Sequence, residues 1–457
     1  MFAAGACQTA VAAAAPAARL TITVHPGAAG AVMPANLIGL SVEASELTRP
    51  QFGAADLVSY MKTLDPAGGV LRVGGNSSDN TFWTSTGERP PSWSQGTITP
   101  ASLHQLASVA KASGWKVILG VNLKHADPTR AADEASHAVS ILGSSLLAIE
   151  IGNEPNYYYT STSAYFTEFE SYVAAIRKAV PGVPLSGPDP GHEHPAFLAA
   201  FASNEARHPD VSIITNHHYP LSACGGAKTT IAELLGTASV QNETGAAQAT
   251  VAAGQQLHVP PAITETNSVT CGGTAGVSNT YASSLWALDY GLLLASSGIT
   301  EADFHGSVSG CGTYSPLCGG GGLVAQPVFY GMLAVTLVGP GHFLQVTNPG
   351  AATIRAYAVS DGSHLTVVLD NVADPAKNGP TTVQLSLGSS YSSGRQALLA
   401  TSSAAGLSAT TGITLGGHAV AANGSFPVPS TTPVSISGQS ATVTLAAGTA
   451  SIIQFTG

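Results

Sequence analysis

The chain has little charge: only 9% of its 457 residues are Asp, Glu, Lys or Arg, against roughly 25% in an average globular protein. Lys and Arg form no cluster, and the formal net charge is −10. Because nucleic acids and anionic membranes attract clustered basic residues, neither is an expected partner. No apolar run reaches the roughly 18 residues of a membrane span. The hydrophobic fraction of 44% is nevertheless enough to bury a sizeable core.

Cysteine is also scarce, with five residues in the chain. Cys311 and Cys318 flank a Gly-rich segment and could close it as a small ring. Cys224 and Cys271 each follow a strand candidate and could pair across the mouth of a barrel, which leaves Cys7 unpaired. The alternative is four free thiols in a cytosolic enzyme. Because thiols in exposed Gly-rich loops are a liability, we favour an oxidising compartment and expect a secreted or periplasmic protein.

The segment 35–341 alternates strand-like and helix-like patterns. Its strand candidates are apolar runs that turn polar only at their carboxyl ends, which is typical of parallel strands buried on both faces: Leu37–Ser45, Gly69–Gly75, Trp115–Asn122, Leu146–Glu154, Leu185–Pro190, Val211–Tyr219, Ala262–Asn267 and Thr300–Gly306. Stretches with apolar spacings of three and four lie between or after them, for example Ala54–Leu64, Ala101–Gly114, Ala131–Gly143, Ala164–Val180, Asn279–Ser297 and Pro327–Val338. Eight such units predict an α/β fold, a (β/α)8 TIM barrel.

A different pattern fills the segment 342–457. Short runs rich in Val, Thr and Leu alternate with period two between Gly, Asn, Ser and Pro, which predicts an antiparallel β-sandwich domain. The run Arg19–His25 alternates in the same way, so we expect the segment 19–34 to add a strand to that sandwich. Residues 1–18 are rich in Ala and lack a basic start. We interpret them as a signal remnant or a disordered segment.

Two glutamates stand where apolar strands reach the C-terminal end of the predicted barrel, which is the active-site end of this fold. Glu154 follows the fourth strand in the sequence Ile-Gly-Asn-Glu-Pro, and Glu265 lies at the end of the seventh in Ile-Thr-Glu-Thr-Asn-Ser. A buried salt bridge or a strand-end cap is the usual explanation for one such Glu. Two that face each other across one mouth favour catalysis, because glycoside hydrolysis requires a pair of carboxyls.

We predict Glu154 as the general acid/base and Glu265 as the nucleophile of a retaining mechanism, with the carboxyls roughly 5–5.5 Å apart. An ionised Glu265 would help Glu154 to keep its proton. Asn153, beside the acid, is expected to bind the sugar 2-hydroxyl. Gly75 lacks the context of a phosphate loop and is expected to let the backbone approach the sugar. His217 is expected to bond within the pocket.

Six motifs, in this order, resemble clan A retaining glycosidases: Val70–Asn76 (VLRVGGN), Ala148–Pro155 (AIEIGNEP), Asn216–Tyr219 (NHHY), Thr264–Ser268 (TETNS), Asp303–Gly306 (DFHG) and Phe329–Leu333 (FYGML). From about Arg19 onward the chain looks like family 79 of the glycoside hydrolases, the β-glucuronidases and heparanases. The bacterial exo-acting β-glucuronidases have the closest pattern. The resemblance implies a C-terminal β domain and the same roles for Glu154 and Glu265.

The resemblance also implies substrate-binding residues. Tyr219 is expected to contact the nucleophile and hold it ionised. Tyr314, with the backbone of Thr313 before it, is expected to receive the glucuronate carboxylate, and Glu43 a distal sugar hydroxyl. One position departs from the family pattern: a second carboxylate-binding Tyr would stand five residues after the nucleophile, where this chain has Thr270. Thr270 could still donate one hydrogen bond, or could leave room for another sugar.

Three other features have two interpretations each. Arg72 either pairs with a buried carboxylate such as Glu150 or Glu154, or lies near Glu265 and keeps it ionised. The histidines at 192–194 and 217–218 suggest a metal, but their spacing fits no zincin signature, so no metal is predicted. Several aromatic side chains either stack on sugars in outer subsites or only pack, namely Trp83, Trp93 and Tyr157–Tyr159.

Together these features predict an exo-acting retaining β-glucuronidase that removes terminal β-linked glucuronic acid without a cofactor and acts as a monomer. One alternative is the same mechanism on a neutral β-glycoside, or on a uronic-acid polysaccharide cut internally, which Thr270 supports. Another is a non-catalytic carbohydrate-binding barrel, because a fold does not guarantee activity. The presence of both glutamates and Tyr219 argues against it, since a degenerate binding protein would be free to lose one.

Overall fold

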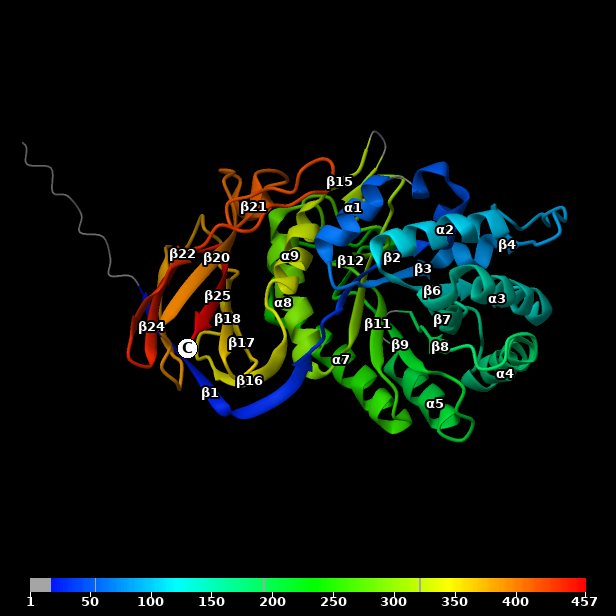
Figure 1. Cartoon of the computed structure of the whole chain (residues 1–457), viewed down its shortest axis with the longest axis horizontal. Helices are drawn as coiled ribbons and strands as arrows, with labels where there is room; N and C mark the ends of the chain where they lie inside the picture. Colours follow the sequence, from blue (N-terminus) through cyan, green and yellow to red (C-terminus); the bar gives the residue numbers. More distant parts are fainter. Residues whose placement is uncertain (1–17, 54, 192–193, 320–321) are drawn as a thin grey trace, which may run out of the picture.

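The structure, a computed structural model, describes residues 18–53, 55–191, 194–319 and 322–457. Figure 1 shows a barrel of strands and helices beside a domain of antiparallel strands. The prediction that residues 1–18 are a signal remnant or a disordered segment falls, except for Ala18, outside the described residues. The same holds for His192 and Glu193 of the histidine cluster.

The predicted (β/α)8 barrel is confirmed. Eight strands close it by parallel pairing in chain order: β2 (Ile38–Glu43), β3 (Val70–Gly74), β6 (Lys116–Val121), β7 (Leu146–Ile151), β8 (Leu185–Pro188), β9 (Ile213–His218), β11 (Pro261–Thr266) and β13 (Glu301–Gly306). Their apolar sequences reflect burial on both faces. Inside the barrel, Val70, Ile118, Ala148, Ile213 and Ala262 form a small separate core.

Helices surround the barrel: α1 (Ala55–Leu64), α2 (Pro100–Ser113), α3 (Pro128–Leu142), α4 (Thr162–Ala179), α5 (Pro195–Glu205), α6 (Ile231–Leu234), α7 (Thr237–Leu257), α8 (Tyr281–Ser297) and α9 (Pro327–Thr336). Proline opens four of them, at position N1, where its missing N–H leaves no bond unmade. Almost all of α8 and α9 is buried. The part of the chain that the structure describes contains no helix long and apolar enough to cross a membrane.

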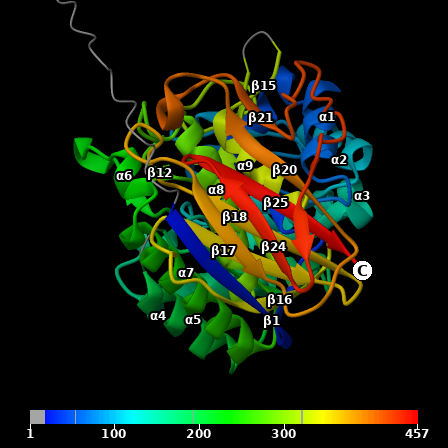
Figure 2. The ribbon, with the colours of Figure 1, turned by 90° about the vertical axis from the view of Figure 1, so that its left-hand side faces the viewer.

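The second domain is built on one continuous sheet. Its strands are β1 (Ala18–Met33), β16 (Gly341–Thr347), β17 (Ile354–Ser360), β18 (His364–Asn371), β19 (Thr381–Ser386), β20 (Ser393–Thr401), β21 (Ile413–Leu415), β22 (Thr432–Pro433), β23 (Ser435–Ser437), β24 (Ser440–Leu445) and β25 (Thr449–Thr456). The pairing is antiparallel except between β1 and β19. Side chains of β1, β19 and β24 share a core with those of β17, β18 and β25, so the sheet folds over on itself. Figure 2 shows this domain from its own side.

The two domains share an apolar boundary. Alternation on β18 explains it: Leu365 and Val367 face the core inside the folded sheet, and Val368 faces the larger core that includes α8 and α9. Polar contacts reinforce the boundary, since Arg355 pairs with Asp289 of α8 at 3.0 Å. The sheet domain thereby supports the two helices that flank β13.

Candidate active site

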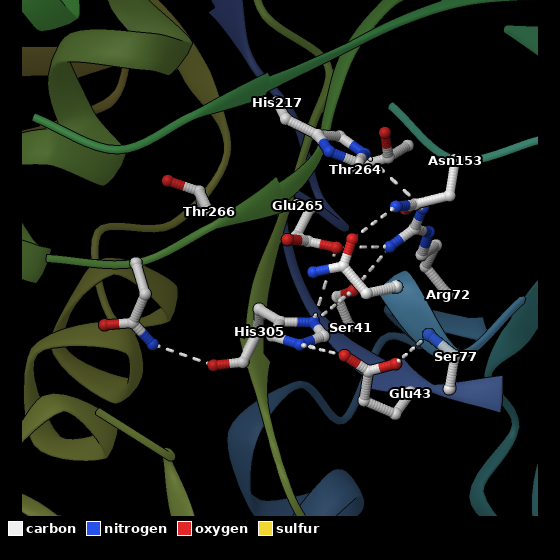
Figure 3. Close-up of polar contacts among 12 residues, drawn as sticks. Ser41, Glu43, Arg72, Ser77, Asn153, His217, Thr264, Glu265, Thr266 and His305 are labelled. Atoms are coloured by element: carbon white, nitrogen blue, oxygen red, sulfur yellow. Dashed lines mark hydrogen bonds and ion pairs between the residues drawn. The ribbon is translucent and has the colours of Figure 1, made fainter. Parts of the chain in front are cut away.

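Glu265, near the end of β11, lies among donors from other parts of the barrel (Figure 3). Arg72 Nη1 donates to its Oε2 at 2.7 Å, and the hydroxyl of Tyr219 donates to its Oε1 at 2.9 Å. His305 Nδ1 stands 3.7 Å from Oε2. Burial alone would raise the pKa of the Glu265 carboxyl, but the surrounding positive charge and the Tyr219 hydrogen bond hold that pKa well below its usual range. The carboxylate is therefore ionised and fixed in orientation.

Arg72, on β3, contacts side chains from several strands inside the barrel. Its guanidinium is fully buried and also bonds Glu150 on β7, with Nη2 2.6 Å from Oε1. The same Nη2 donates to Asn153 Oδ1 at 2.9 Å. Both interpretations of Arg72 from the sequence therefore hold together: it pairs with Glu150, and it also contacts Glu265. A buried guanidinium with paired carboxylates avoids the large cost of an unpaired buried charge.

Glu154 is placed by an unusual backbone turn after β7. Its φ is +46°, in the left-handed region that non-glycine residues seldom adopt, and Gly152 before it has φ +88°. The Glu154 N–H donates to the carbonyl of Asp189 at 3.0 Å, which holds the turn against the loop after β8. Asp189 itself has φ +50°. Such conformations persist where the surrounding structure fixes them, and they cluster at functional sites.

His217, on β9, joins the loops that follow β7 and β8. Its Nδ1 lies 3.2 Å from Glu154 Oε1, and its Nε2 lies 3.4 Å from Asp189 Oδ1. Burial would lower the pKa of this imidazole, but the charge of Glu265 and the two carboxylate contacts raise it to about 10. His217 is therefore a cation whose two nitrogens both face carboxylates.

His305, on β13, plays a similar part on the other side of Glu265. Its Nδ1 lies 3.0 Å from Ser41 Oγ and its Nε2 lies 3.5 Å from Glu43 Oε1. Burial opposes the charge of His305, but the charge of Glu265 and the contact with Glu43 outweigh it and raise the pKa of the imidazole. Glu43 also accepts a hydrogen bond from the backbone N–H of Ser77 at 2.7 Å.

Gly75 and Asn153 complete the wall between β3 and β7. Gly75 has φ +70°, where other residues are strained, and a Cβ there would stand 2.7 Å from the carboxyl carbon of Glu43 and displace that side chain. Asn153 is almost fully buried. Its side-chain nitrogen lies 3.3 Å from Asn76 Oδ1, and Arg72 fixes its oxygen, so the amide is held rigidly beside Glu154.

The loop after β13 brings Tyr314 to the site. The Tyr314 ring lies 6.2 Å from that of Tyr219 and 6.1 Å from that of His305, measured between centroids. Asn267 Nδ2 donates to the carbonyl of Tyr314 at 2.9 Å and fixes this loop against β11. Thr313, before it, is partly buried.

Thr270 lies on a small two-stranded sheet formed by β10 (Leu221–Ser222) and β12 (Val269–Thr270). Its hydroxyl donates to Ser222 Oγ at 2.9 Å and lies 3.1 Å from Cys224 Sγ. The Thr270 hydroxyl thus bonds the neighbouring loop after β9.

Both predicted disulfides are present, Cys224–Cys271 and Cys311–Cys318. The first joins the loops after β9 and β11, which are neighbours in the barrel, so it links adjacent loops and does not span the mouth. The second closes the small ring in the loop that carries Tyr314. The two bonds brace the three loops that follow β9, β11 and β13.

Carboxylate oxygens of Glu154 and Glu265 and a ring nitrogen of His217 all lie within 4.8 Å of one another. A cation could fit such a set by distance alone. In the structure both ring nitrogens of His217 face carboxylates, those of Glu154 and Asp189, which suits a proton on each nitrogen. The arrangement suits proton transfer and nucleophilic attack at one small centre.

Three residues of the site were not singled out as binding or catalytic from the sequence: Ser41, Asp189 and His305. His305 appears in the DFHG motif, and Asp189 ends a strand run in the sequence Gly-Pro-Asp-Pro. The criterion that found the two glutamates, a polar residue at the carboxyl end of a barrel strand, applies equally to Asp189 and His305.

No protein-family profile matches the sequence, and no curated protein matches it. Solved structures do share its fold. A 4-O-α-L-rhamnosyl-β-D-glucuronidase from Fusarium oxysporum is 20% identical with a TM-score of 0.77, covering 96% of this chain and 100% of that one. The GH51 arabinofuranosidase from Xanthomonas axonopodis is 12% identical (TM-score 0.67; 96% and 99% covered). A GH30 endoxylanase from Clostridium papyrosolvens is 12% identical (TM-score 0.57; 96% and 100% covered). The chain therefore shares the two-domain architecture of these glycoside hydrolases.

Proposed function

We propose that the protein is an exo-acting retaining β-glycosidase, secreted or periplasmic, that removes terminal β-linked glucuronic acid. The observation that carries the proposal is the pair Glu154 and Glu265, whose carboxylate oxygens approach within 4.8 Å. Inverting enzymes keep their carboxyls roughly 6.5–9.5 Å apart to admit a water molecule. An approach of single oxygens within 4.8 Å fits the roughly 5–5.5 Å between the carboxyl groups of retaining enzymes, and so supports attack by the carboxylate itself. The fold shared with a β-D-glucuronidase and the family 79 motifs point to the same chemistry.

In the first step, Glu265 attacks the anomeric carbon while Glu154 gives its proton to the leaving oxygen. The bond to the aglycone breaks and a covalent glycosyl-enzyme forms on Glu265. Water then attacks the anomeric carbon, Glu154 takes its proton, and the bond to Glu265 breaks. Asn153, beside Glu154, would bond the sugar 2-hydroxyl.

The glucuronate carboxylate would lie against Tyr314 and the backbone beside Thr313, between the ring of His305 and the loop that carries Thr270. A neutral β-glycoside is a second candidate substrate. The specific observation in its favour is that the Thr270 hydroxyl already donates to Ser222, at the position where the family pattern has a carboxylate-binding Tyr. Fewer donors then remain for a carboxylate.

Hydrolysis of p-nitrophenyl β-glucuronide beside p-nitrophenyl β-glucoside tests the substrate. We expect the larger kcat/KM for the glucuronide, and we expect Tyr314→Phe to reduce it more than it reduces activity on the glucoside. A larger kcat/KM for the glucoside would overturn the glucuronide assignment and leave the mechanism standing. Activity on neither substrate, with larger β-glycosides also uncleaved, would favour a non-catalytic carbohydrate-binding barrel.

A further inference from the structure

A second cavity, of about 370 Å³, lies away from the two glutamates. It is lined by β4 (Thr81–Trp83), by residues of the segment 84–95 and of the loop that follows β6, and by the first turns of α3. Figure 1 shows β4 and α3 on the side of the barrel that is farthest from the sheet domain. The residues that line it make no hydrogen bond to Glu154 or Glu265 in the described structure, so the catalytic mechanism does not account for it.

Aromatic rings form much of the cavity wall. Trp93 and His125 stack with their centroids 3.6 Å apart and their planes 10° from parallel. Phe82 meets Trp93 edge-on at 6.0 Å. Trp93 is only partly buried although its ring is packed on one side, so part of the indole faces the cavity. Aromatic walls with a few fixed polar groups are typical of small-molecule sites.

Glu134 supplies the polar group at the buried end. It points from α3 into the cavity wall, is only 4% exposed, and makes no hydrogen bond or ion pair with any residue that the structure describes. Burial, and then the charge of Asp133, raise the pKa of its carboxyl to about 8. At neutral pH the carboxyl is therefore largely protonated and offers both a donor and an acceptor. A hydroxylated ligand would supply hydrogen-bond partners for this carboxyl.

Three charged side chains that line the cavity, Arg130, Asp127 and Glu88, pair with one another, and a fourth, Arg89, is exposed. Arg130 donates to Asp127 at 3.0 Å and to Glu88 at 3.1 Å, and its guanidinium covers the ring of Phe82 at 4.2 Å. Trp83 Nε1 donates to Asp133 at 2.7 Å. These bonds hold the walls in place before any ligand arrives, and such preorganisation lowers the cost of binding. They also leave no unpaired charge deep in the cavity.

We propose that this cavity is a second carbohydrate-binding site that takes one neutral pyranose ring. The apolar face of the ring would lie on Trp93, and its hydroxyls would bond the Glu134 carboxyl. The preference for a neutral ring follows from the pairing of Arg130 with Asp127 and Glu88, which leaves its guanidinium little attraction for an anionic sugar. The site would hold a sugar unit apart from the bond being cleaved, and the inference does not depend on hydrolysis at Glu265.

Isothermal titration calorimetry with methyl β-D-glucopyranoside, methyl β-D-xylopyranoside and sodium glucuronate tests it on the full chain. We expect saturable binding of a neutral pyranoside that weakens about tenfold or more in Trp93→Ala and in Glu134→Leu. Glu134→Gln, which keeps the shape and the hydrogen bonding, should bind nearly as well as the wild type. All three variants should keep the thermal midpoint and the kcat/KM on small chromogenic substrates.

Unchanged pyranoside affinity in both Trp93→Ala and Glu134→Leu would overturn the proposal, as would wild-type protein that binds neither pyranoside. Glucuronate binding that is lost in Trp93→Ala, without pyranoside binding, would overturn the neutral ligand. An inactive enzyme that still binds a pyranoside through Trp93 would sustain this inference while the proposed function failed. An active enzyme that binds no pyranoside through Trp93 would overturn this inference and leave the proposed function standing.

Discussion

The two glutamates of the mouth are held in different ways. Glu265 receives direct hydrogen bonds from Arg72 and Tyr219, with His305 close by. Among the described residues, only His217 makes a polar contact with the carboxylate of Glu154. The backbone of Glu154 has a left-handed conformation. Dense donors fix one carboxylate as an anion before substrate arrives, which is preorganisation for attack. The sparse contacts of the other suit a group that must change protonation twice in each cycle.

Removing each carboxyl in turn should give the largest effect. Glu265→Gln should lower kcat by roughly 10⁴-fold or more on every substrate, because no other group can form the glycosyl-enzyme. Glu154→Ala should retain far more activity on a 2,4-dinitrophenyl glycoside, whose leaving group needs no proton, than on an alkyl glycoside. Steady-state kinetics on both substrates measures the difference. Equal losses in the two variants on the dinitrophenyl substrate would contradict the assigned roles.

Removing one donor from Glu265 should give a smaller effect. Tyr219→Phe should lower kcat/KM by roughly 10- to 100-fold, since a hydrogen bond to a charged group contributes about 1.5–3 kcal/mol. The Tyr219 hydrogen bond is one of the causes that depress the pKa of Glu265. The acid limb of the kcat/KM profile, where Glu265 gains a proton, should therefore move to higher pH in the variant. A profile that loses height without any shift would show that Tyr219 does not act through Glu265.

The cation beside Glu154 should be visible in stability. The pKa of His217 is raised to about 10 in the folded protein, from about 6.5 when unfolded. Its contribution is complete below about pH 6.5 and is lost as the pH rises toward 10, because the folded state then holds a proton that the unfolded state has released. Urea unfolding at a series of pH values should show the free energy of unfolding falling across this range.

His217→Gln is the matched variant for that measurement. Between pH 7 and 10, the free energy of unfolding of this variant should fall less than that of the wild type. We expect the two falls to differ by on the order of a few kcal/mol. A slope identical to that of the wild type would mean that the imidazole is neutral, and the contacts with Glu154 and Asp189 would then need a different explanation.

The smallest effect on chemistry should come from the disulfide on the Glu265 side. Cys224→Ser with Cys271→Ser opens a loop of 47 residues in sequence separation, and we expect a loss of about 2–4 kcal/mol in stability. Because Arg72 and Tyr219 hold Glu265 from the strands, kcat should fall only a few fold. A loss as large as that of Tyr219→Phe would show that the loops, and not the barrel strands, position the nucleophile.

The barrel was predictable because each strand is buried on both faces and ends in polar residues. The change from apolar to polar residues therefore shows where each strand ends. The same logic located Glu154 and Glu265. The sequence pattern could not predict both partners of Arg72. A side chain inside a closed barrel can contact strands that are far apart in the chain, here β7 and β11. Neither period-two alternation nor turn residues could show that β1 pairs in parallel with β19, because that register depends on how the sheet folds over.

Asp189 and Glu134 show a second limit. The Pro-Asp-Pro sequence around Asp189 is typical of a turn, and its role arises only because the turn meets Glu154 and His217 in space. Glu134 looks in the sequence like any charged residue on a helix, and only the packing of α3 against the barrel buries it.

The stereochemistry of hydrolysis tests the central claim most directly. Proton NMR of the first minutes of reaction, on the chromogenic β-glycoside that the enzyme cleaves best, identifies the anomer formed before mutarotation. Two displacements through Glu265 predict that the β-anomer appears first and the α-anomer follows only as the solution equilibrates. Immediate appearance of the α-anomer would mean a single displacement by water, and would contradict Glu265 as the nucleophile.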